Sequence, residues 1–286
     1  MTENIPSKLG VIGGGRMGAG IAQVFAAAGA EVVVAESDAD AAKAAGERIA
    51  AGLRKAVELG KLDDADKAFA RVSLVTAPTA LPADAEVVIE AVPEIPALKT
   101  EILATVEGVL NPDAVLASNT SSLSITELSS VLRRPERFLG MHFFNPVPAS
   151  KLVEIVRTEA TAAAVRDSAV RWVRAIGKTD VVVNDSPGFA TSRLGVLLGL
   201  EAIRMLEEGV TDAVGIDTAM ELGYRHPMGP LRSTDLVGLD VRLAVAEYLT
   251  STLGDRFTPP RLLREKVARG ELGRKTGRGF FEWTEL

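Results

Sequence analysis

Apolar and polar residues alternate along the first part of the chain in blocks that predict strands and helices in turn. The apolar run Leu9–Ile12 ends at a group of glycines. Apolar residues then recur at the spacing of one helix face, at Met17, Ile21, Val24 and Phe25. The β-branched run Val32–Val34 lies in the next predicted strand. The chain therefore opens with a strand, a helix and a second strand.

The glycines at the first turn fit the spacing of a dinucleotide-binding loop. Gly13, Gly15 and Gly18 form G-x-G-x-x-G between the strand and the helix, and Glu36 ends the second strand. The glycines allow a tight turn, close approach of a pyrophosphate and close packing of helix on strand, while the acid binds the ribose hydroxyls. We expect NAD rather than NADP, because Glu36 would repel a 2′-phosphate. A glycine turn in an unrelated α/β protein is the alternative.

The alternation continues to residue 183 and predicts a parallel sheet with helices on both faces. Further strands are expected at Arg71–Val75, Ala85–Val92, Ala114–Ala117, Arg137–Phe144, Lys151–Arg157 and Thr179–Val183. Long helices are expected at Asp38–Leu59 and Ala162–Ile176.

The segment Asn184–Gly188 breaks this pattern and marks a domain boundary. Beyond it, helices are expected at Phe189–Leu206, Thr211–Leu222, Asp240–Leu253 and Arg261–Arg269. The first of these is too apolar for an isolated surface helix, which favours burial within a helical domain or against another subunit. We therefore predict an α/β fold, a Rossmann-like doubly wound sheet that binds NAD over residues 1–186, followed by an all-helical C-terminal domain over residues 187–286.

A hairpin between two predicted strands brings a histidine and a glutamate together. If its loop centres near Val147 and Pro148, residues whose numbers sum to about 296 face each other, as His142 and Glu154 do. Their Cβ atoms would then lie roughly 5 Å apart. An imidazole beside a carboxylate is a candidate general base with its orienting group. A structural histidine satisfied by a buried glutamate is the alternative.

Polar residues also follow the other strand ends. Glu94 and Lys99 come after one strand, where open α/β sheets bind ligands, or they form an ordinary pair at a helix start. Ser124 precedes Glu127 by three residues and is expected to cap a helix, which leaves Ser121 and Ser122 for a substrate oxygen.

Several other charged or titratable residues have two possible interpretations. Lys55 and Lys61 lie at the end of a helix that is either a solvated face or a positive rim for a phosphate-bearing substrate. The loop around Lys275 is either a solvated end or an anion site. His226 lies in a turn-rich segment and is expected to be structural.

The composition of the chain argues against several classes of partner and of catalytic site. The formal net charge is −6, with no long basic run, which argues against nucleic acid or a membrane surface as a partner. The chain has no cysteine, which excludes disulfides and thiol catalysis, and its 2 histidines make a zinc site improbable. Neither a signal region at Met1–Ser7 nor a membrane-spanning run is evident, so a cytoplasmic protein is expected.

Together these motifs resemble the L-3-hydroxyacyl-CoA dehydrogenase family, of the 3-hydroxybutyryl-CoA dehydrogenase type. The similarity covers nearly the whole chain. It rests on the glycine loop, Glu90–Glu94–Lys99, Ser118–Ser122, His142–Pro146, Lys151–Glu154, Ser186–Phe189, Gly229-Pro230 and the tail Lys275–Phe280.

The resemblance implies reversible, NAD-dependent oxidation of a short (S)-3-hydroxyacyl-CoA to the 3-oxoacyl-CoA. His142 would be the base, Glu154 would orient it, and Ser121 would bind the substrate hydroxyl. The remaining NAD contacts would come from Arg16, Met17, Glu94, Lys99, Asn145 and Lys275, together with Ser121. A homodimer through the C-terminal domain, which also contributes to the substrate cleft, is expected.

One position departs from the family pattern. Ser192 stands where the family usually has asparagine, and serine is shorter and lacks the planar amide. The acyl group therefore sits differently or water fills the gap, and Ser192, Lys55 and Lys61 are weaker candidates for substrate contacts. Two other hypotheses remain: a dehydrogenase of a free 3-hydroxy acid or sugar acid of the gulonate type, and a non-catalytic NAD-binding protein.

Overall fold

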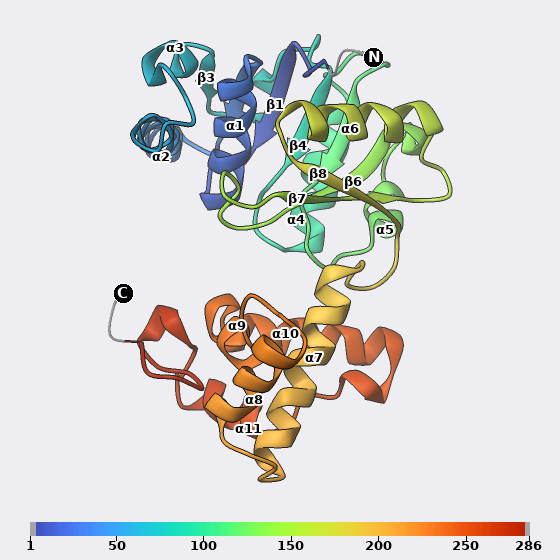
Figure 1. The fold of residues 1–286 in the computed structure, drawn as a ribbon. Coiled ribbons are helices and arrows are strands. Elements are labelled where there is room, and N and C mark those ends of the chain that lie inside the picture. Colours follow the sequence, from blue (N-terminus) through green and yellow to red (C-terminus); the bar gives the residue numbers. More distant parts are fainter. Residues whose placement is uncertain (1–3, 284–286) are drawn as a thin grey trace. The chain divides into compact units, whose positions relative to one another are not determined.

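The computed structural model describes residues 4–283, and the chain divides into two compact units between Ser186 and Pro187. The described part of the first unit is built on a sheet of 8 strands (Figure 1). These strands are β1 (Lys8–Ile12), β2 (Glu31–Ala35), β3 (Val72–Val75), β4 (Val87–Glu90), β5 (Val115–Ser118), β6 (Phe138–Phe143), β7 (Leu152–Arg157) and β8 (Thr179–Asn184). Every predicted strand is therefore present, with ends shifted by a few residues.

The strand order is β3-β2-β1-β4-β5-β6-β7-β8. Neighbouring strands are parallel except β6 and β7, which form the antiparallel hairpin. The chain crosses from one side of β1 to the other between β3 and β4. Such a reversal leaves a crevice at the carboxyl ends of the strands, where doubly wound sheets bind ligands.

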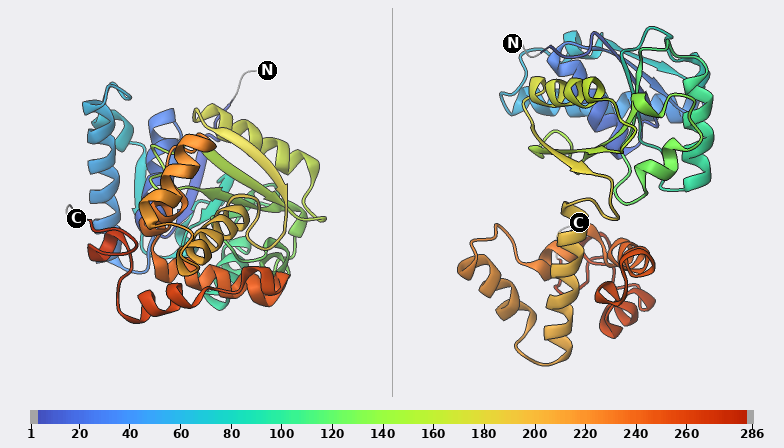
Figure 2. Two further views of the ribbon diagram at one scale, coloured as in Figure 1. Left: turned by 60° about the horizontal axis from the view of Figure 1, so that its bottom comes forward. Right: turned by 90° about the vertical axis from the view of Figure 1, so that its right-hand side faces the viewer.

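Helices cover both faces of this sheet, as the alternating pattern predicts. They are α1 (Arg16–Ala28), α2 (Ala39–Glu58), α3 (Ala65–Phe69), α4 (Pro96–Glu107), α5 (Ile125–Ser129) and α6 (Ala163–Ala175). The right-hand view of Figure 2 shows α6 on one side of the sheet and α4 on the other. The short helix α5 is the one that the pair of Ser124 and Glu127 was expected to cap, whereas α3, with only 5 residues, has no counterpart in the sequence prediction.

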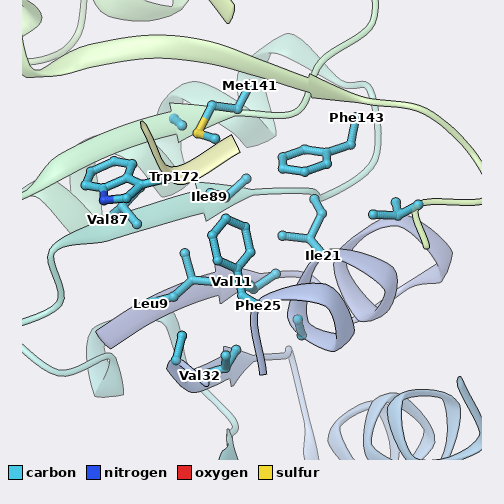
Figure 3. Packing of buried hydrophobic residues seen from close by; sticks show 14 of the residues in the cluster. Leu9, Val11, Ile21, Phe25, Val32, Val87, Ile89, Met141, Phe143 and Trp172 are labelled. Carbon is cyan, nitrogen blue, oxygen red and sulfur yellow. The ribbon is translucent and has the colours of Figure 1, made fainter. Parts of the chain in front are cut away.

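The core between α1, α6 and the sheet is made by every second residue of the central strands. Figure 3 shows Phe25 of α1 among Leu9, Val11 and Ile89, with Phe143 nearby. The rings of Phe25 and Phe143 meet edge to face, with centroids 6.4 Å apart. The hairpin strand β6 is therefore packed directly onto the helix that follows the glycine loop.

The described part of the second unit is helical, apart from isolated bridges near its end. Its helices are α7 (Thr191–Glu207), α8 (Ala213–Thr218), α9 (Pro230–Val237), α10 (Leu239–Leu253) and α11 (Arg261–Ala268), and a π-helical turn at Ala219–Gly223 extends α8. No described helix in either unit is both long and apolar enough to span a bilayer.

The helix α9 is absent from the sequence prediction, which assigned only a turn to the residues before it. Its first turn is capped from a distance: buried Asp217 of α8 accepts hydrogen bonds from the amides of Leu231 and Arg232, at 2.9 and 2.8 Å. Burial raises the pKa of Asp217, and these two bonds oppose that effect. The local sequence offers only the proline at the first position of α9 as a start signal, because the side-chain cap comes from another helix.

The same helix also anchors the last described residues, Phe280 to Trp283. Asp235 of α9 is 1% exposed and accepts hydrogen bonds from the amides of Phe280 and Phe281 and from the indole of Trp283, at 2.8, 2.9 and 2.9 Å. One buried carboxylate therefore holds residues that are about 45 positions away in the sequence.

We expect Asp235→Ala to lower the free energy of unfolding of the second unit by roughly 2–4 kcal/mol, because three donors lose a charged acceptor. Urea unfolding followed by the fluorescence of Trp283 measures this loss. Asp255→Ala, at an exposed position of the same unit, is the control and should change stability by less than about 0.5 kcal/mol. Equal stability of the two variants would contradict the anchoring role.

Candidate active site

The glycine loop joins β1 to α1 with the geometry that its spacing predicts. Gly13 has φ +88°, a left-handed conformation that favours glycine. A Cβ at Gly18 would lie 1.7 Å from the carbonyl oxygen of Gly13, so helix and loop could not pack this closely with any side chain there. Among the described residues, and apart from the chain neighbours of Gly15, no atom lies within 4 Å of a Cβ built at this position. The loop therefore packs tightly against α1 at Gly18, while Gly15 leaves space beside the backbone.

Glu36 ties the end of β2 to this loop. Its carboxylate accepts a hydrogen bond of 2.6 Å from the amide of Gly14. A Cβ at Gly14 would approach the Cβ of Ala45 in α2 to 2.4 Å, so this position also requires glycine. Sequence analysis singled out the other three glycines and missed Gly14, because its constraint comes from α2.

A cavity of about 690 Å³ lies over the loop. Its lining includes five residues predicted to bind cofactor: Gly13, Gly15, Arg16, Met17 and Glu36. The apolar part of the lining comes from Ile12, Ala35, Pro78, Ala91, Val92, Pro93, Leu98 and Ile102. This mixture of an apolar wall and a few polar groups is typical of cofactor sites.

The residues around this cavity fit a dinucleotide. The helix α1 begins at Arg16 with no side chain capping its first amides, so these amides can bind phosphate oxygens. The space beside Gly15 lets a pyrophosphate approach the backbone.

The hairpin brings the predicted histidine and glutamate into contact. His142 on β6 pairs with Glu154 on β7 in the antiparallel register, as the loop position predicted. The Nδ1 atom of His142 lies 2.9 Å from Oε2 of Glu154, and the residues are 6% and 0% exposed. Because an ionised carboxylate only accepts hydrogen bonds, Nδ1 is the donor in this pair. The ring of Phe144 lies beside the imidazole, with centroids 4.3 Å apart.

The loop after His142 is held from two sides. Val147 packs against Gly20 of α1, where a Cβ would come within 2.8 Å of it. The ammonium of Lys178 donates to the carbonyls of Val147 and Ser150 at 2.6 and 2.5 Å. Burial lowers the pKa of Lys178. Lys178 was not identified from the sequence, because its hydrogen-bond acceptors are backbone carbonyls, which no side-chain pattern reveals. Asn145, a predicted NAD contact, lies exposed in this loop.

A buried ion pair sits at the carboxyl ends of β4 and β5. Lys99 and Glu90 are 1% and 0% exposed, and Nζ lies 2.6 Å from Oε1. Glu90 also accepts from the Ser118 hydroxyl at 2.5 Å and from the amide of Val92 at 2.7 Å. Lys99 is therefore mainly committed to Glu90, a partner that spacing alone did not identify. The pair holds Val92, which lines the cavity.

Glu94 connects this ion pair to the hydroxyl-rich segment after β5. Its carboxylate lies 3.2 Å from Nζ of Lys99 and accepts from the amide of Ser121 at 3.0 Å. The Thr120 hydroxyl also donates to it. Burial raises the pKa of Glu94, but the Lys99 charge and the hydrogen bonds outweigh that effect and leave the pKa below its ordinary value.

Comparison with known proteins places the chain in a family. Residues 8–186 match the family model "3-hydroxyacyl-CoA dehydrogenase, NAD binding domain", and residues 188–283 match "3-hydroxyacyl-CoA dehydrogenase, C-terminal domain". The chain belongs to the 3-hydroxyacyl-CoA dehydrogenase family. It is therefore an oxidoreductase that acts on a CH–OH group, and its cofactor is NAD.

Relatives agree over nearly the full length. The probable 3-hydroxybutyryl-CoA dehydrogenase of Bacillus subtilis is 43% identical over 277 residues, which cover 96% of each chain. The crystal structure of FadB2 from Mycobacterium tuberculosis gives a TM-score of 0.93 at 41% identity, covering 98% of this chain and 100% of that one. The (S)-3-hydroxybutyryl-CoA dehydrogenase PaaH1 of Ralstonia eutropha gives 0.93 at 39% identity, with the same coverage.

In this dehydrogenase, one predicted serine has a structural role. The Ser124 hydroxyl accepts from the amide of Glu127 at 3.2 Å and donates to Asp185 at 2.8 Å, so it caps α5 as expected. Ser122 is largely buried, and its hydroxyl lies 3.4 Å from Glu94. Of the two serines predicted to serve function, Ser121 is the more accessible.

The remaining predicted residues lie on other elements of their own units. On α2, Lys55 pairs with Glu58 at 2.9 Å, and Lys61 is exposed beyond it. In the second unit, Lys275 pairs with Asp240 at 2.6 Å, and Ser192 lies in the first turn of α7. Among residues 4–283, no three His, Asp or Glu side chains gather closely enough to hold a metal ion.

We expect Glu94→Gln to be less stable than wild type at neutral pH, with the difference shrinking as the pH falls below about 4.5. A lowered folded-state pKa adds stability above the unfolded pKa, and this stability is lost as the carboxylate is protonated. Urea unfolding between pH 7 and pH 3 measures it. Glu101→Gln, an exposed residue of α4, sets the baseline for losing one charge. A stability difference independent of pH would argue against the ionic role.

Proposed function

We propose that this chain oxidises a short (S)-3-hydroxyacyl-CoA, such as 3-hydroxybutyryl-CoA, to the 3-oxoacyl-CoA, reversibly and with NAD. The observation that carries the proposal is the buried pair of His142 and Glu154 on the sheet that also carries the glycine loop. The similarity to the 3-hydroxybutyryl-CoA dehydrogenases of B. subtilis and R. eutropha supports this substrate.

In this proposal His142 is the general base. Its Nε2 takes the proton of the substrate hydroxyl while the hydride leaves the carbon that bears this hydroxyl. The imidazole then becomes an imidazolium. Glu154 stabilises that cation and holds the ring through Nδ1, 2.9 Å from its carboxylate. Bound NAD supplies the hydride acceptor.

Other residues position the reacting groups. Ser121 binds the substrate hydroxyl, and its amide is held by Glu94. Gly13, Gly15, Arg16, Met17, Gly18 and Glu36 form the dinucleotide site, with Asn145, Glu94, Lys99 and Lys275 as further cofactor contacts. The ammonium of Lys99 is bound to Glu90, so Lys99 affects the cofactor site mainly by holding the buried pair in place.

We also propose that residues 187–286 contribute to the substrate site and to a cytoplasmic homodimer, with neither nucleic acid nor membrane as partner. The exposed apolar residues Leu194, Leu197 and Leu198 on α7 support the dimer, because a water-exposed apolar stripe favours a partner surface.

We expect His142→Ala to lower kcat/KM by about 10²- to 10⁴-fold while NAD affinity stays close to wild type, because the imidazole moves a proton and the glycine loop holds the cofactor. Glu154→Gln should lower kcat by a similar factor. NADH formation from (S)-3-hydroxybutyryl-CoA and calorimetric NAD titration measure the two effects. The control is His226→Ala, which removes the other imidazole. Undiminished turnover in His142→Ala would remove this residue from the mechanism.

The alternative substrate is a free 3-hydroxy acid or sugar acid. The specific observation for it is that Lys55, predicted to meet a phosphate-bearing handle, is paired with Glu58. We expect the CoA thioester to react at least about 100-fold faster than the free acid, because binding energy from a remote handle positions the reacting carbon. Steady-state rates with 3-hydroxybutyryl-CoA and 3-hydroxybutyrate decide this, and equal rates would favour the alternative.

A further inference from the structure

The turn between β1 and α1 contains three glycines in succession, Gly13, Gly14 and Gly15. Glycine loses more conformational freedom on ordering than any other residue, so a run of three is unfavourable to hold in one conformation. If such a loop became ordered only when a ligand binds, the lost entropy would weaken binding. Contacts that order this loop in advance therefore strengthen the binding of a cofactor.

Both hydrogen-bonding groups of the Gly14 main chain have side-chain partners. Its amide donates to Glu36, directly after β2, over 2.6 Å. Its carbonyl accepts from Nη1 of Arg48, on α2, over 3.2 Å. Two different elements thus hold the middle of the loop.

The contact with Arg48 also sets the direction of the next amide. The carbonyl of Gly14 and the N–H of Gly15 belong to one planar trans peptide unit, in which the two groups point in opposite directions. A carbonyl held toward α2 therefore turns the Gly15 amide away from that helix. Among residues 4–283 this amide has no hydrogen-bond partner, and Gly15 lines the cavity over the loop. It is thus available to a phosphate oxygen.

This peptide unit needs an external restraint. Glycines lie on both sides of it, so no Cβ opposes its rotation. A rotation by half a turn would direct the carbonyl oxygen toward the cavity, where it would repel a pyrophosphate. The hydrogen bond from Arg48 opposes this rotation, because the guanidinium is a charged donor and cannot accept a bond from the amide in exchange.

Arg48 projects from a helix that is firmly held. Ala45 and Ile49, on either side of it in the sequence, are 0% exposed. Further along α2, a Cβ at Gly52 would overlap the side-chain amide of Gln23 on α1, so the two helices are in close contact there. A side chain on a packed helix is a more precise anchor than one on a loop.

The guanidinium of Arg48 is not committed to an acid. Among the described residues its hydrogen bond goes to the carbonyl of Gly14, with no ion pair beside it. Lys55, on the same helix, is instead paired with Glu58 at 2.9 Å. The carbonyl of the glycine loop is therefore the defined partner of Arg48.

We infer that Arg48 is a positioning residue for NAD, which holds the peptide unit between Gly14 and Gly15 so that the Gly15 amide faces the pyrophosphate. The inference rests on the proposed placement of the dinucleotide over the glycine loop. It assigns to α2 a role in cofactor affinity that the spacing of the glycines does not contain.

The test measures cofactor binding apart from catalysis. We expect Arg48→Met to raise the Kd of NAD by about 3- to 10-fold, the effect of losing one hydrogen bond. The kcat at saturating NAD should stay within about twofold of wild type, because Arg48 touches no reacting atom. Arg48→Lys keeps a charged donor and should restore part of the affinity. Arg54→Met, which removes the same charge from an exposed position of α2, is the matched control and should leave the Kd unchanged.

Two further measurements locate the effect in the loop. Calorimetric titration with ADP-ribose, which has the pyrophosphate but not the nicotinamide, should show the same rise in Kd as NAD. Hydrogen exchange of the cofactor-free protein should be faster at Gly13–Gly18 in Arg48→Met than in wild type or Arg54→Met. Because Arg48 is exposed, the variant should keep its fold, which thermal unfolding checks.

The outcomes separate this role from the proposed reaction. An unchanged Kd in Arg48→Met overturns the inference, as does a rise in Kd without faster exchange in the loop. An equal rise in Arg48→Met and Arg54→Met would assign the effect to net charge and also overturn it. A wild type that binds NAD but oxidises no 3-hydroxyacyl-CoA would refute the proposed substrate, while the comparison of Kd values would still test Arg48.

Discussion

The register between β6 and β7 is the constraint on which the candidate active site depends. A shift of one residue along either strand would turn every side chain of that strand to the opposite face and separate His142 from Glu154. The register is set by apolar neighbours: Met141 and Phe143 on β6, and Val153 and Ile155 on β7, are all buried in the core. Packing of ordinary core residues thus positions the two polar ones.

The same packing connects the hairpin to the dinucleotide loop. Phe143 meets Phe25 of α1, and Val147 of the hairpin loop meets Gly20 of the same helix. Across the switch point from β1, the pair of Glu90 and Lys99 holds Val92 at the cavity wall. Glu94 extends this network to Ser121. The glycine loop, the histidine and the serine are therefore held by one continuous set of contacts within the first unit.

The buried lysines and arginine among residues 4–283 differ in how their charges are compensated. Lys99 is neutralised by a buried carboxylate, which makes the pair a rigid part of the sheet edge. Lys178 has backbone carbonyls as partners and acts as a clamp on the hairpin loop. Among the described residues, Arg242 has no carboxylate within ion-pair distance, and its Nε has no hydrogen-bond partner. A buried charge with a partner is compensated within the fold, whereas one without a partner lowers the stability of the fold.

Sequence alone determined the features that depend on local spacing. Hydrophobic periodicity located the strands and long helices, the glycine spacing placed the dinucleotide loop, and counting across a short hairpin paired His142 with Glu154. Each follows from the two-residue repeat of strands, the 3.6-residue repeat of helices or the geometry of a tight connection.

Tertiary structure decided what depends on partners that are distant in the chain. Glu90 as the partner of Lys99, Asp217 as the cap of α9 and the carbonyls bound by Lys178 could not be seen in any local pattern. Arg242 is the clearest case, because only the folded second unit shows that its charge is buried and that no described carboxylate pairs with it. Spacing along a chain specifies nearby geometry, but burial and charge pairing are properties of residues that folding brings together.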